Sequence, residues 1–195
     1  LQSKNIILNR YQIIKAYMVF GGIPYYLEAL EKGKSIDQSI DELLFDENGL
    51  LFQEYQNLYQ ALFTNAENYI EVIKALASKN KGLTREELAK NTQLKTGGTL
   101  TAILNDLELS DFIKVYQPFG KQKRNSLYQL TDAYSLFYYN FIDHKKIQKG
   151  YWLHNIDNPK MRAWSGYAFE MVCMQHIEQI KKAFGISGVF TEVSS

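Results

Sequence analysis

Apolar side chains recur every three to four residues over most of the chain, which is the period of an amphipathic helix. Between residues 1 and 63 this pattern predicts four helices. The first helix is expected to bury one stripe, formed by Ile7, Tyr11, Ile14 and Met18. Pro24 and Gly33 bracket the second helix, and Ser35 with Gln38 forms a capping box before the third. Proline at a helix start, glycine just past its end and a capping box are the signals expected of short, well-defined helices.

The middle third of the chain changes to three helices followed by a hairpin. Thr64 with Glu67 is expected to cap the first of these helices and Gly82 to close it. The third helix presents four apolar residues to the core: Leu100, Ile103, Leu104 and Leu107. Two runs rich in β-branched and aromatic residues then flank a polar tip at residues 120–125. Helix, helix, turn, helix and hairpin is the order typical of a winged helix-turn-helix.

The last third begins with an aromatic helix and continues into a long helix over residues 162–184, which Gly185 is expected to end. Residues 189–193 are predicted to form one strand. Because one strand cannot form a sheet, it pairs with the hairpin or with another chain, or its sheet continues beyond Ser195.

These patterns give a mainly α chain in three segments: residues 1–63, 64–131 and 132–195. Of the 195 residues, 46% are hydrophobic and 22% are charged, an ordinary composition for a folded protein. The net charge of +1 excludes the global basic field of an obligate nucleic-acid binder. We expect this chain, which starts at Leu1, to be a piece of a longer protein.

The cellular compartment is inferred from three absences in the sequence. A lone Cys173 permits no internal disulfide. No apolar run approaches the ~18–20 residues of a membrane span, and no secretory leader is visible. We therefore expect a cytoplasmic location and no membrane partner.

Several familiar chemistries have no motif in the sequence. There is no phosphate-binding loop of the G-x-x-x-x-G-K-[ST] type, and no Ser-His-Asp set is supported by spacing. Cys173 and His176 are three residues apart on the predicted long helix, but a zinc site needs three or four ligands. We therefore predict no metal site in this chain and interpret the pair as a buried thiol beside a surface histidine.

A winged helix invites a DNA-binding hypothesis, in which the third helix enters the major groove and the wing touches the backbone. The exposed positions over residues 99–109 include Asp106 and Glu108 and no Lys or Arg. The basic residues that favour a nucleic-acid contact lie before this helix and in the wing: Lys95, Lys121, Lys123 and Arg124. Phosphate binding depends on such residues, and a solvated hairpin tip is the competing interpretation.

The sharpest local feature is the run Gly-Gly-Ile-Pro-Tyr-Tyr-Leu from Gly21 to Leu27. Its two glycines allow a close backbone approach and its proline fixes the first turn of a helix, so a tight helix–helix corner would also explain it. Further motifs follow in order: the winged helix, Leu-Thr-Asp at 130–132 running into Phe-Tyr-Tyr-Asn-Phe at 137–141, and Gly-Tyr-Ala-Phe-Glu at 166–170. Together they resemble an archaeal and bacterial ATPase family of the AAA+/STAND class, whose C-terminal domain of unknown function resembles PD-(D/E)xK nucleases.

The resemblance covers essentially the whole chain. It implies that residues 1–63 are the helical lid of an ATPase whose phosphate-binding core precedes Leu1, and that Gly22 and Pro24 contact the adenine of the nucleotide. ATP and Mg²⁺ would then be cofactors of the full-length parent, with none expected in this chain alone. The resemblance also places Glu170 at the first acidic position of a nuclease-like α/β domain that begins in residues 132–195. An ordinary surface carboxylate, or one paired with Lys160 or Arg162, is the alternative for Glu170.

We therefore expect the regulatory and binding part of a P-loop ATPase, in which the winged helix relays nucleotide state to a protein or nucleic-acid partner. The acidic third helix favours a protein partner. We expect this chain alone not to be catalytic. The alternative is a stand-alone winged-helix transcription regulator whose terminal helices make a dimer. The sequence leaves the oligomeric state open.

Overall fold

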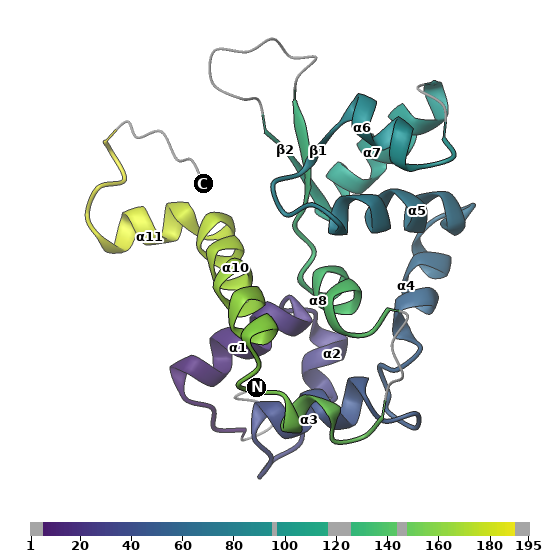
Figure 1. Cartoon of the computed structure of the whole chain (residues 1–195). Coiled ribbons are helices and arrows are strands. Elements are labelled where there is room, and N and C mark those ends of the chain that lie inside the picture. The colour runs from purple at the N-terminus through teal and green to yellow at the C-terminus, as the bar shows by residue number, and fades with distance from the viewer. Residues whose placement is uncertain (1–5, 95–96, 117–125, 144–147, 190–195) are drawn as a thin grey trace. The chain divides into compact units, whose positions relative to one another are not determined.

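The computed structural model of the chain describes residues 6–94, 97–116, 126–143 and 148–189. The described chain is mainly helical and carries one small antiparallel sheet (Figure 1). It divides into two compact units, residues 1–156 and residues 157–195. The expected segment boundaries after residues 63 and 131 both fall inside the first unit.

Four helices open the first unit, as the apolar pattern predicts: α1 (Arg10–Phe20), α2 (Pro24–Glu28), α3 (Ile36–Leu44) and α4 (Glu54–Leu62). The capping box of α3 is present, because Ser35 and Gln38 exchange backbone-to-side-chain hydrogen bonds. The expected stripe on α1 is wrong at its first two positions and right at Met18. Ile7 and Tyr11 are exposed, and the buried side chains are Ala16, Met18, Val19 and Phe20. The reason is that α8 and α3 pack against α1, and Ile7 precedes the helix altogether.

Three helices and three strands follow: α5 (Ala66–Ala77), β1 (Leu83–Thr84), α6 (Arg85–Asn91), α7 (Gly98–Leu109), β2 (Ile113–Tyr116) and β3 (Leu127–Leu130). The strand order is β1-β3-β2, all antiparallel, with Leu83 opposite Tyr128 and Ile113 opposite Leu130. As predicted, α7 buries Leu100, Ile103, Leu104 and Leu107. The two-residue strand β1 is absent from the prediction because so short a run has no period of its own.

The two predicted boundary signals of α5 are wrong. Its N-cap is Asn65, in a left-handed conformation with φ 60° and no side-chain cap, so Thr64 lies one residue too early to cap the helix. The helix ends at Ala77, well before Gly82. Gly82 serves the sheet instead: its φ is +83°, and a Cβ there would lie 2.6 Å from the carbonyl oxygen of Tyr128.

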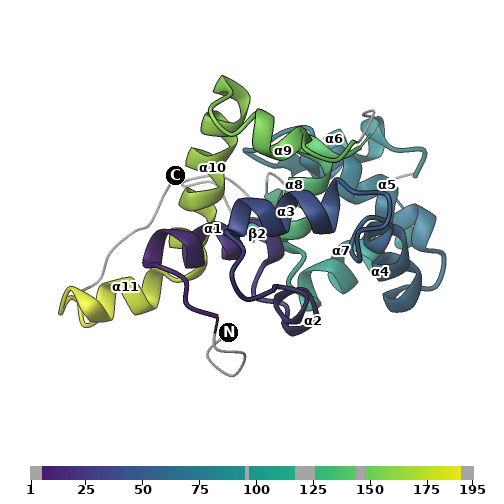
Figure 2. The same ribbon diagram turned by 90° about the horizontal axis from the view of Figure 1, so that it is seen from below.

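The first unit closes with α8 (Ala133–Phe141) and α9 (Tyr151–His154). Asp132 caps α8 by accepting the backbone N–H of Ser135 at 2.7 Å. Helix α9 lies along α3, as both views show (Figures 1 and 2). The aromatic helix predicted at the start of the last third is therefore part of the same core as the first four helices.

The second unit contains α10 (Pro159–Gln175) and α11 (Ile177–Ala183). The single long helix predicted over residues 162–184 is thus wrong, because His176 leaves helical geometry at φ −109° and ψ 22°. Gly185 follows the end of α11 with φ +73°, as predicted. Of the predicted strand, residues 190–193 lie outside the described part of the chain. Among the helices described in both units, none is long and apolar enough to span a bilayer.

Candidate functional site

The corner between α1 and α2 is built by two glycines with positive φ, Gly21 at +69° and Gly22 at +85°. Gly21 ends α1 in the left-handed conformation, and its N–H donates to the carbonyl of Tyr17. A Cβ at Gly22 would lie 2.8 Å from Cε2 of Tyr17, so the ring and the corner fit closely. Pro24 occupies the first turn of α2. Gly22 and Pro24 are both exposed, so the corner presents them to an incoming ligand or partner.

Tyr26 lies directly behind this corner and is 1% exposed. Its hydroxyl donates to Oε1 of Glu54 at 3.3 Å, and its ring centroid is 5.0 Å from that of Tyr134 on α8. The hydroxyl of Tyr134 donates to the carbonyl of Leu51 at 3.1 Å. Burial raises the pKa of both phenols. Both therefore stay neutral and act as hydrogen-bond donors rather than as general acids or bases.

Helices α4 and α8 meet in a row of tyrosines behind Tyr26. Tyr59 is fully buried, and its hydroxyl is 2.8 Å from Oγ of Ser135. Tyr55 donates to the hydroxyl of Tyr139 at 2.8 Å, and its ring lies 4.9 Å from that of Tyr59. The spacing of Tyr55 and Tyr59 predicts one buried face, but no sequence pattern indicates that α8 supplies their partners.

The same row continues from α4 to α7. The rings of Tyr59 and Phe63 are 6.1 Å apart, and Phe63 stacks on Tyr69 of α5 at 4.1 Å with an interplanar angle of 8°. The hydroxyl of Tyr69 donates to Oδ2 of Asp106 on α7 at 2.6 Å. This hydrogen bond is the main reason that the pKa of Tyr69 is raised to about 12. Asp106, predicted as an exposed acidic position, is thus engaged by a phenol.

Helices α6 and α7 are joined by a basic side chain that no sequence pattern indicates. The Arg85 guanidinium donates to the carbonyl of Gly97 at 3.1 Å and to Oγ1 of Thr101 at 2.6 Å. It therefore lies at the N-terminus of α7, although it belongs to α6. Its position twelve residues before Gly97 gives no periodic signal, because the two residues belong to different elements.

The N-terminus of α6 carries a complete capping box. The Glu87 carboxylate accepts from Nζ of Lys79 at 2.8 Å and from the backbone N–H of Thr84 at 2.7 Å. These two hydrogen bonds, Lys79 first, lower the pKa of Glu87 to about 2. Lys79 and Glu87 therefore form an ion pair, and Glu87 also caps the N-terminus of α6.

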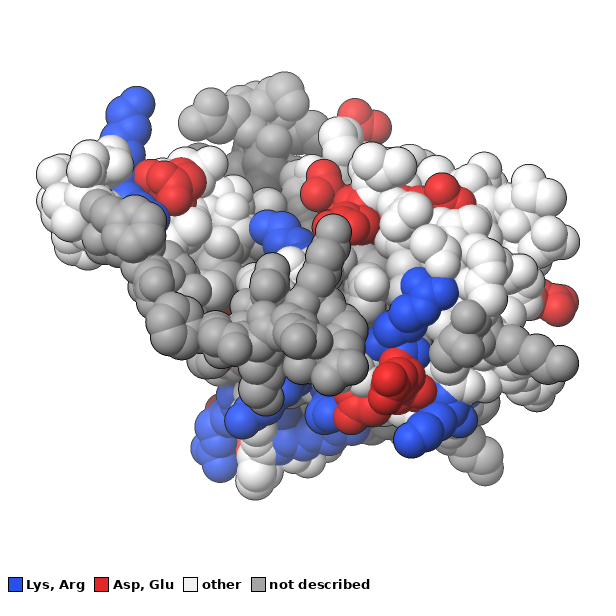
Figure 3. Space-filling model, turned by 90° about the horizontal axis from the view of Figure 1, so that it is seen from above, with Lys and Arg blue, Asp and Glu red and all other residues white. Residues whose placement is uncertain are grey.

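The exposed face of α7 carries no Lys or Arg between Gly98 and Leu109. Glu108 and Leu109 are exposed there, Leu109 by 84%. Figure 3 views the molecule from above, and in this view Lys and Arg side chains lie next to Asp and Glu side chains. The four basic residues predicted to contact nucleic acid, Lys95, Lys121, Lys123 and Arg124, lie outside the described residues.

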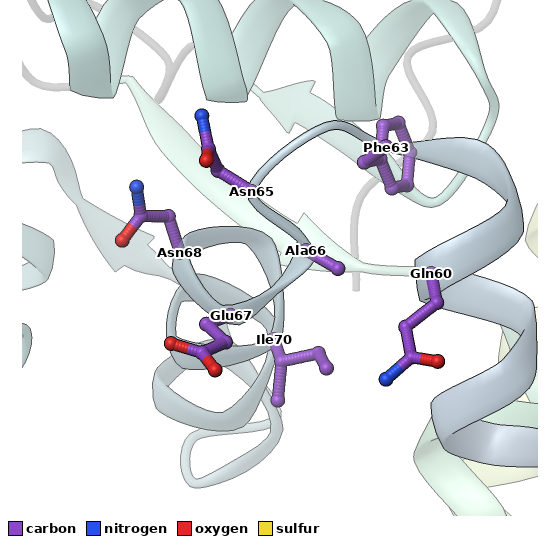
Figure 4. A pocket seen from close by; sticks show the side chains of 7 residues that line it. All are labelled: Gln60, Phe63, Asn65, Ala66, Glu67, Asn68 and Ile70. Carbon is purple, nitrogen blue, oxygen red and sulfur yellow. The ribbon is translucent and has the colours of Figure 1, made fainter.

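A depression of about 520 Å³ lies at the α4–α5 corner. Ala66 and Ile70 of α5 point toward Gln60 of α4, whereas Asn65 and Asn68 point to the other side of α5 (Figure 4). Because these side chains do not converge on one point, they make no preorganised binding site.

In the second unit, Glu170 is exposed on α10 and forms no ion pair with any described residue, Lys160 and Arg162 included. Cys173 is a free, half-buried thiol near the end of α10, and the helix breaks at His176. The prediction that the two residues share one continuous helix face is therefore wrong. Within the described ranges, no group of three or more His, Cys, Asp or Glu side chains could hold a metal ion.

No protein-family model, no curated protein and no solved structure matches this chain.

Proposed function

We propose that residues 66–130 form a winged helix-turn-helix binding module within the regulatory part of a P-loop ATPase. The order α5, β1, α6, α7, β2, β3 supports the module, as does the placement of β3 between β1 and β2. In a winged helix the short first strand pairs with the outgoing hairpin in this manner, and the hairpin becomes the wing. The finer assignment to an ATPase comes from the sequence resemblance.

The observation that carries the proposal is a continuous row of contacts from the glycine corner to α7. Its members, in order, are Tyr26, Tyr134, Tyr55, Tyr59, Phe63, Tyr69 and Asp106. Successive ring centroids lie 4.1 to 6.5 Å apart, and the row ends in the hydrogen bond from Tyr69 to Asp106. Close-packed interiors transmit displacement because they leave no voids to absorb it. A shift of α2 would therefore reach α7.

In this proposal the corner at Gly22 and Pro24 touches the base of a nucleotide held by a preceding core. The two residues suit that contact because both are exposed and neither carries a side chain that would block a flat ring. They offer no group that would hold phosphate or Mg²⁺, so those remain with the core. Nucleotide hydrolysis there would supply the free energy that moves the corner.

Residues 157–195 would begin the nuclease-like domain of the resemblance. Their separation into a second compact unit supports a domain change near residue 156 rather than at residue 132. Glu170 is the acidic residue of this unit to which the resemblance points. We propose no cleavage by this chain, since a metal-dependent nuclease needs clustered carboxylates.

The partner that α7 favours is a protein. The outer face of α7 carries Glu108 and the exposed Leu109. It lacks Lys and Arg, which binding to duplex DNA would require. An acidic face with one apolar contact suits a basic, partly apolar protein surface.

The test is hydrogen exchange on the full-length protein with ATP and Mg²⁺, and again with ADP and Mg²⁺. The proposal expects amide protection of α6 and α7 to differ between the two nucleotides, and Tyr59→Ala to remove that difference. A protein that binds both nucleotides yet shows identical exchange in α6 and α7 would overturn the proposed relay.

Duplex DNA binding is the second candidate, and Arg85 favours it. The positive end of the α7 dipole and the Arg85 guanidinium lie together, a combination that suits a backbone phosphate. Anisotropy titration of a labelled duplex at two salt concentrations tests it. Binding that weakens with salt and falls further in Arg85→Ala than in Lys90→Ala, a matched charge loss at the other end of α6, would support this candidate. No binding at low salt would exclude it.

A further inference from the structure

A second depression lies where α4 begins and faces α8, and no residue of the glycine corner lines it. Its volume is about 320 Å³, at the small end of the range of ligand pockets. Six of the described residues line it: Phe52, Gln53, Tyr55, Gln56, Asn57 and Tyr138. All are neutral, and two kinds of side chain make up the wall, aromatic rings and primary amides.

The aromatic part of the wall is held in place. The rings of Tyr55 and Tyr138 stack at 3.9 Å with an interplanar angle of 8°. Tyr55 is 3% exposed and is fixed by its hydrogen bond to Tyr139. Tyr138 is only half-buried, so part of its ring borders the depression. A rigid ring that costs no reordering is a good stacking platform for a flat ligand.

The amide part of the wall has unused hydrogen-bonding capacity. Gln53, Gln56 and Asn57 are exposed, and none of their side-chain amides hydrogen-bonds to another described residue. Each amide offers two N–H donors and one carbonyl acceptor. Because they follow one another around the first turns of α4, they border the depression from one side.

We propose that this depression binds a neutral, planar heterocycle with a donor–acceptor edge, namely a nucleobase or nucleoside. The base would lie against the ring of Tyr138, and its edge would pair with the amides of Gln56 and Asn57. Asn and Gln amides match the adjacent N–H donor and ring-nitrogen acceptor of adenine. Among the described residues, no cationic side chain lines the depression, so this lining gives a phosphate no ionic partner and the proposal assigns recognition to the base. The site does not depend on the ATPase proposal, and neither Gly22 nor Pro24 is among the residues that line it.

The test is a titration of the 195-residue chain with adenosine, followed by NMR signals of the side-chain amides. The proposal expects saturable shifts of the Gln56 and Asn57 amide signals, equal in midpoint for adenosine and ATP. Gln56→Ala is expected to weaken binding at least fivefold. Gln60→Ala is the matched control, because it removes the same side chain one turn later on α4, outside the depression, and is expected to leave binding unchanged. Backbone spectra of both variants verify that they fold.

Each other outcome overturns the proposal. The absence of saturable shifts, or equal weakening in Gln56→Ala and Gln60→Ala, removes the site. Shifts confined to residues 21–26 would support the nucleotide contact proposed for the glycine corner and contradict this second site. Shifts of the same amides by methyl glucoside but not by adenosine would make the ligand a sugar rather than a base.

Discussion

The carboxylate of Asp41 lies 2.8 Å from the backbone nitrogen of Trp152, 111 positions further along the chain. It also accepts the N–H of Gly150 at 2.6 Å and of Leu153 at 3.4 Å, and it is 2% exposed. One turn earlier on α3, Asp37 accepts the indole N–H of Trp152 at 2.8 Å. Two aspartates four residues apart therefore hold α9 against α3. We call these hydrogen bonds from Asp37 and Asp41 to α9 and to Gly150 before it the clamp.

Replacing Asp41 by Asn is expected to destabilise the protein by about 1–3 kcal/mol, because an amide keeps one acceptor and turns an NH₂ group toward backbone donors. The measurement is urea unfolding. Glu47→Gln makes the same change of charge at an exposed position in the loop after α3 and is expected to have little effect. Equal losses in the two variants would show that charge, and not the clamp, matters.

The buried hydroxyl pair of Tyr59 and Ser135 gives a second prediction. Tyr59→Phe leaves the serine hydroxyl without its partner and is expected to cost about 1–2 kcal/mol. Ser135→Ala in the same chain removes that orphaned group, so the double variant is expected to be more stable than the sum of the single losses implies. Additive losses in the double-mutant cycle would mean that the two hydroxyls do not interact.

Alkaline pH is expected to weaken the contact between α5 and α7. The hydrogen bond to Asp106 favours the neutral phenol and raises the pKa of Tyr69 from its ordinary 10.0 to about 12. A raised folded-state pKa contributes stability that is complete below the unfolded pKa, so this contribution is present below pH 10 and disappears between about pH 10 and 12. Unfolding measured across this window is expected to show a steeper loss in the wild type than in Tyr69→Phe. Parallel curves would contradict the assignment.

Two glycines on either side of α6 are expected to respond in opposite ways to alanine. Gly82 has φ +83°, and a Cβ added there would meet a carbonyl oxygen at 2.6 Å, so Gly82→Ala is expected to cost more than about 1 kcal/mol. Gly98 starts α7 with open space around it and without a positive φ, so Gly98→Ala is expected to stabilise by about 0.4–1 kcal/mol through the unfolded chain. Thermal unfolding of both variants checks the pair. A harmless Gly82→Ala would mean that β3 does not approach this turn.

Much of the fold could be predicted from the sequence because periodicity and caps are local. The four buried residues of α7 and the capping box at Ser35 are confirmed for that reason. The predicted stripe on α1 is wrong at Ile7 and Tyr11, because burial of this helix is decided by α3 and by α8, which lies more than a hundred residues away. Periodicity can identify a face but cannot say which of two apolar faces a distant helix covers.

The candidate site was less predictable for the same reason. The spacing of Tyr55 and Tyr59 indicates a shared face, yet the partners Ser135 and Tyr139 come from another helix. Arg85 of α6 contacts the start of α7, a contact between two helices that no sequence period indicates. Local signals predict the elements, and long-range packing decides which side chains meet.

The central claim is that Tyr59 couples the first four helices to residues 66–130, so that losing its contacts destabilises both parts together. Native-state hydrogen exchange on the 195-residue chain tests it, comparing the wild type with Tyr59→Ala and with Leu62→Ala, an exposed residue of α4. The claim predicts that Tyr59→Ala lowers the protection free energy of amides in α3 and α7 by the same amount, while Leu62→Ala lowers neither. Loss of protection in α3 with α7 unchanged would contradict it.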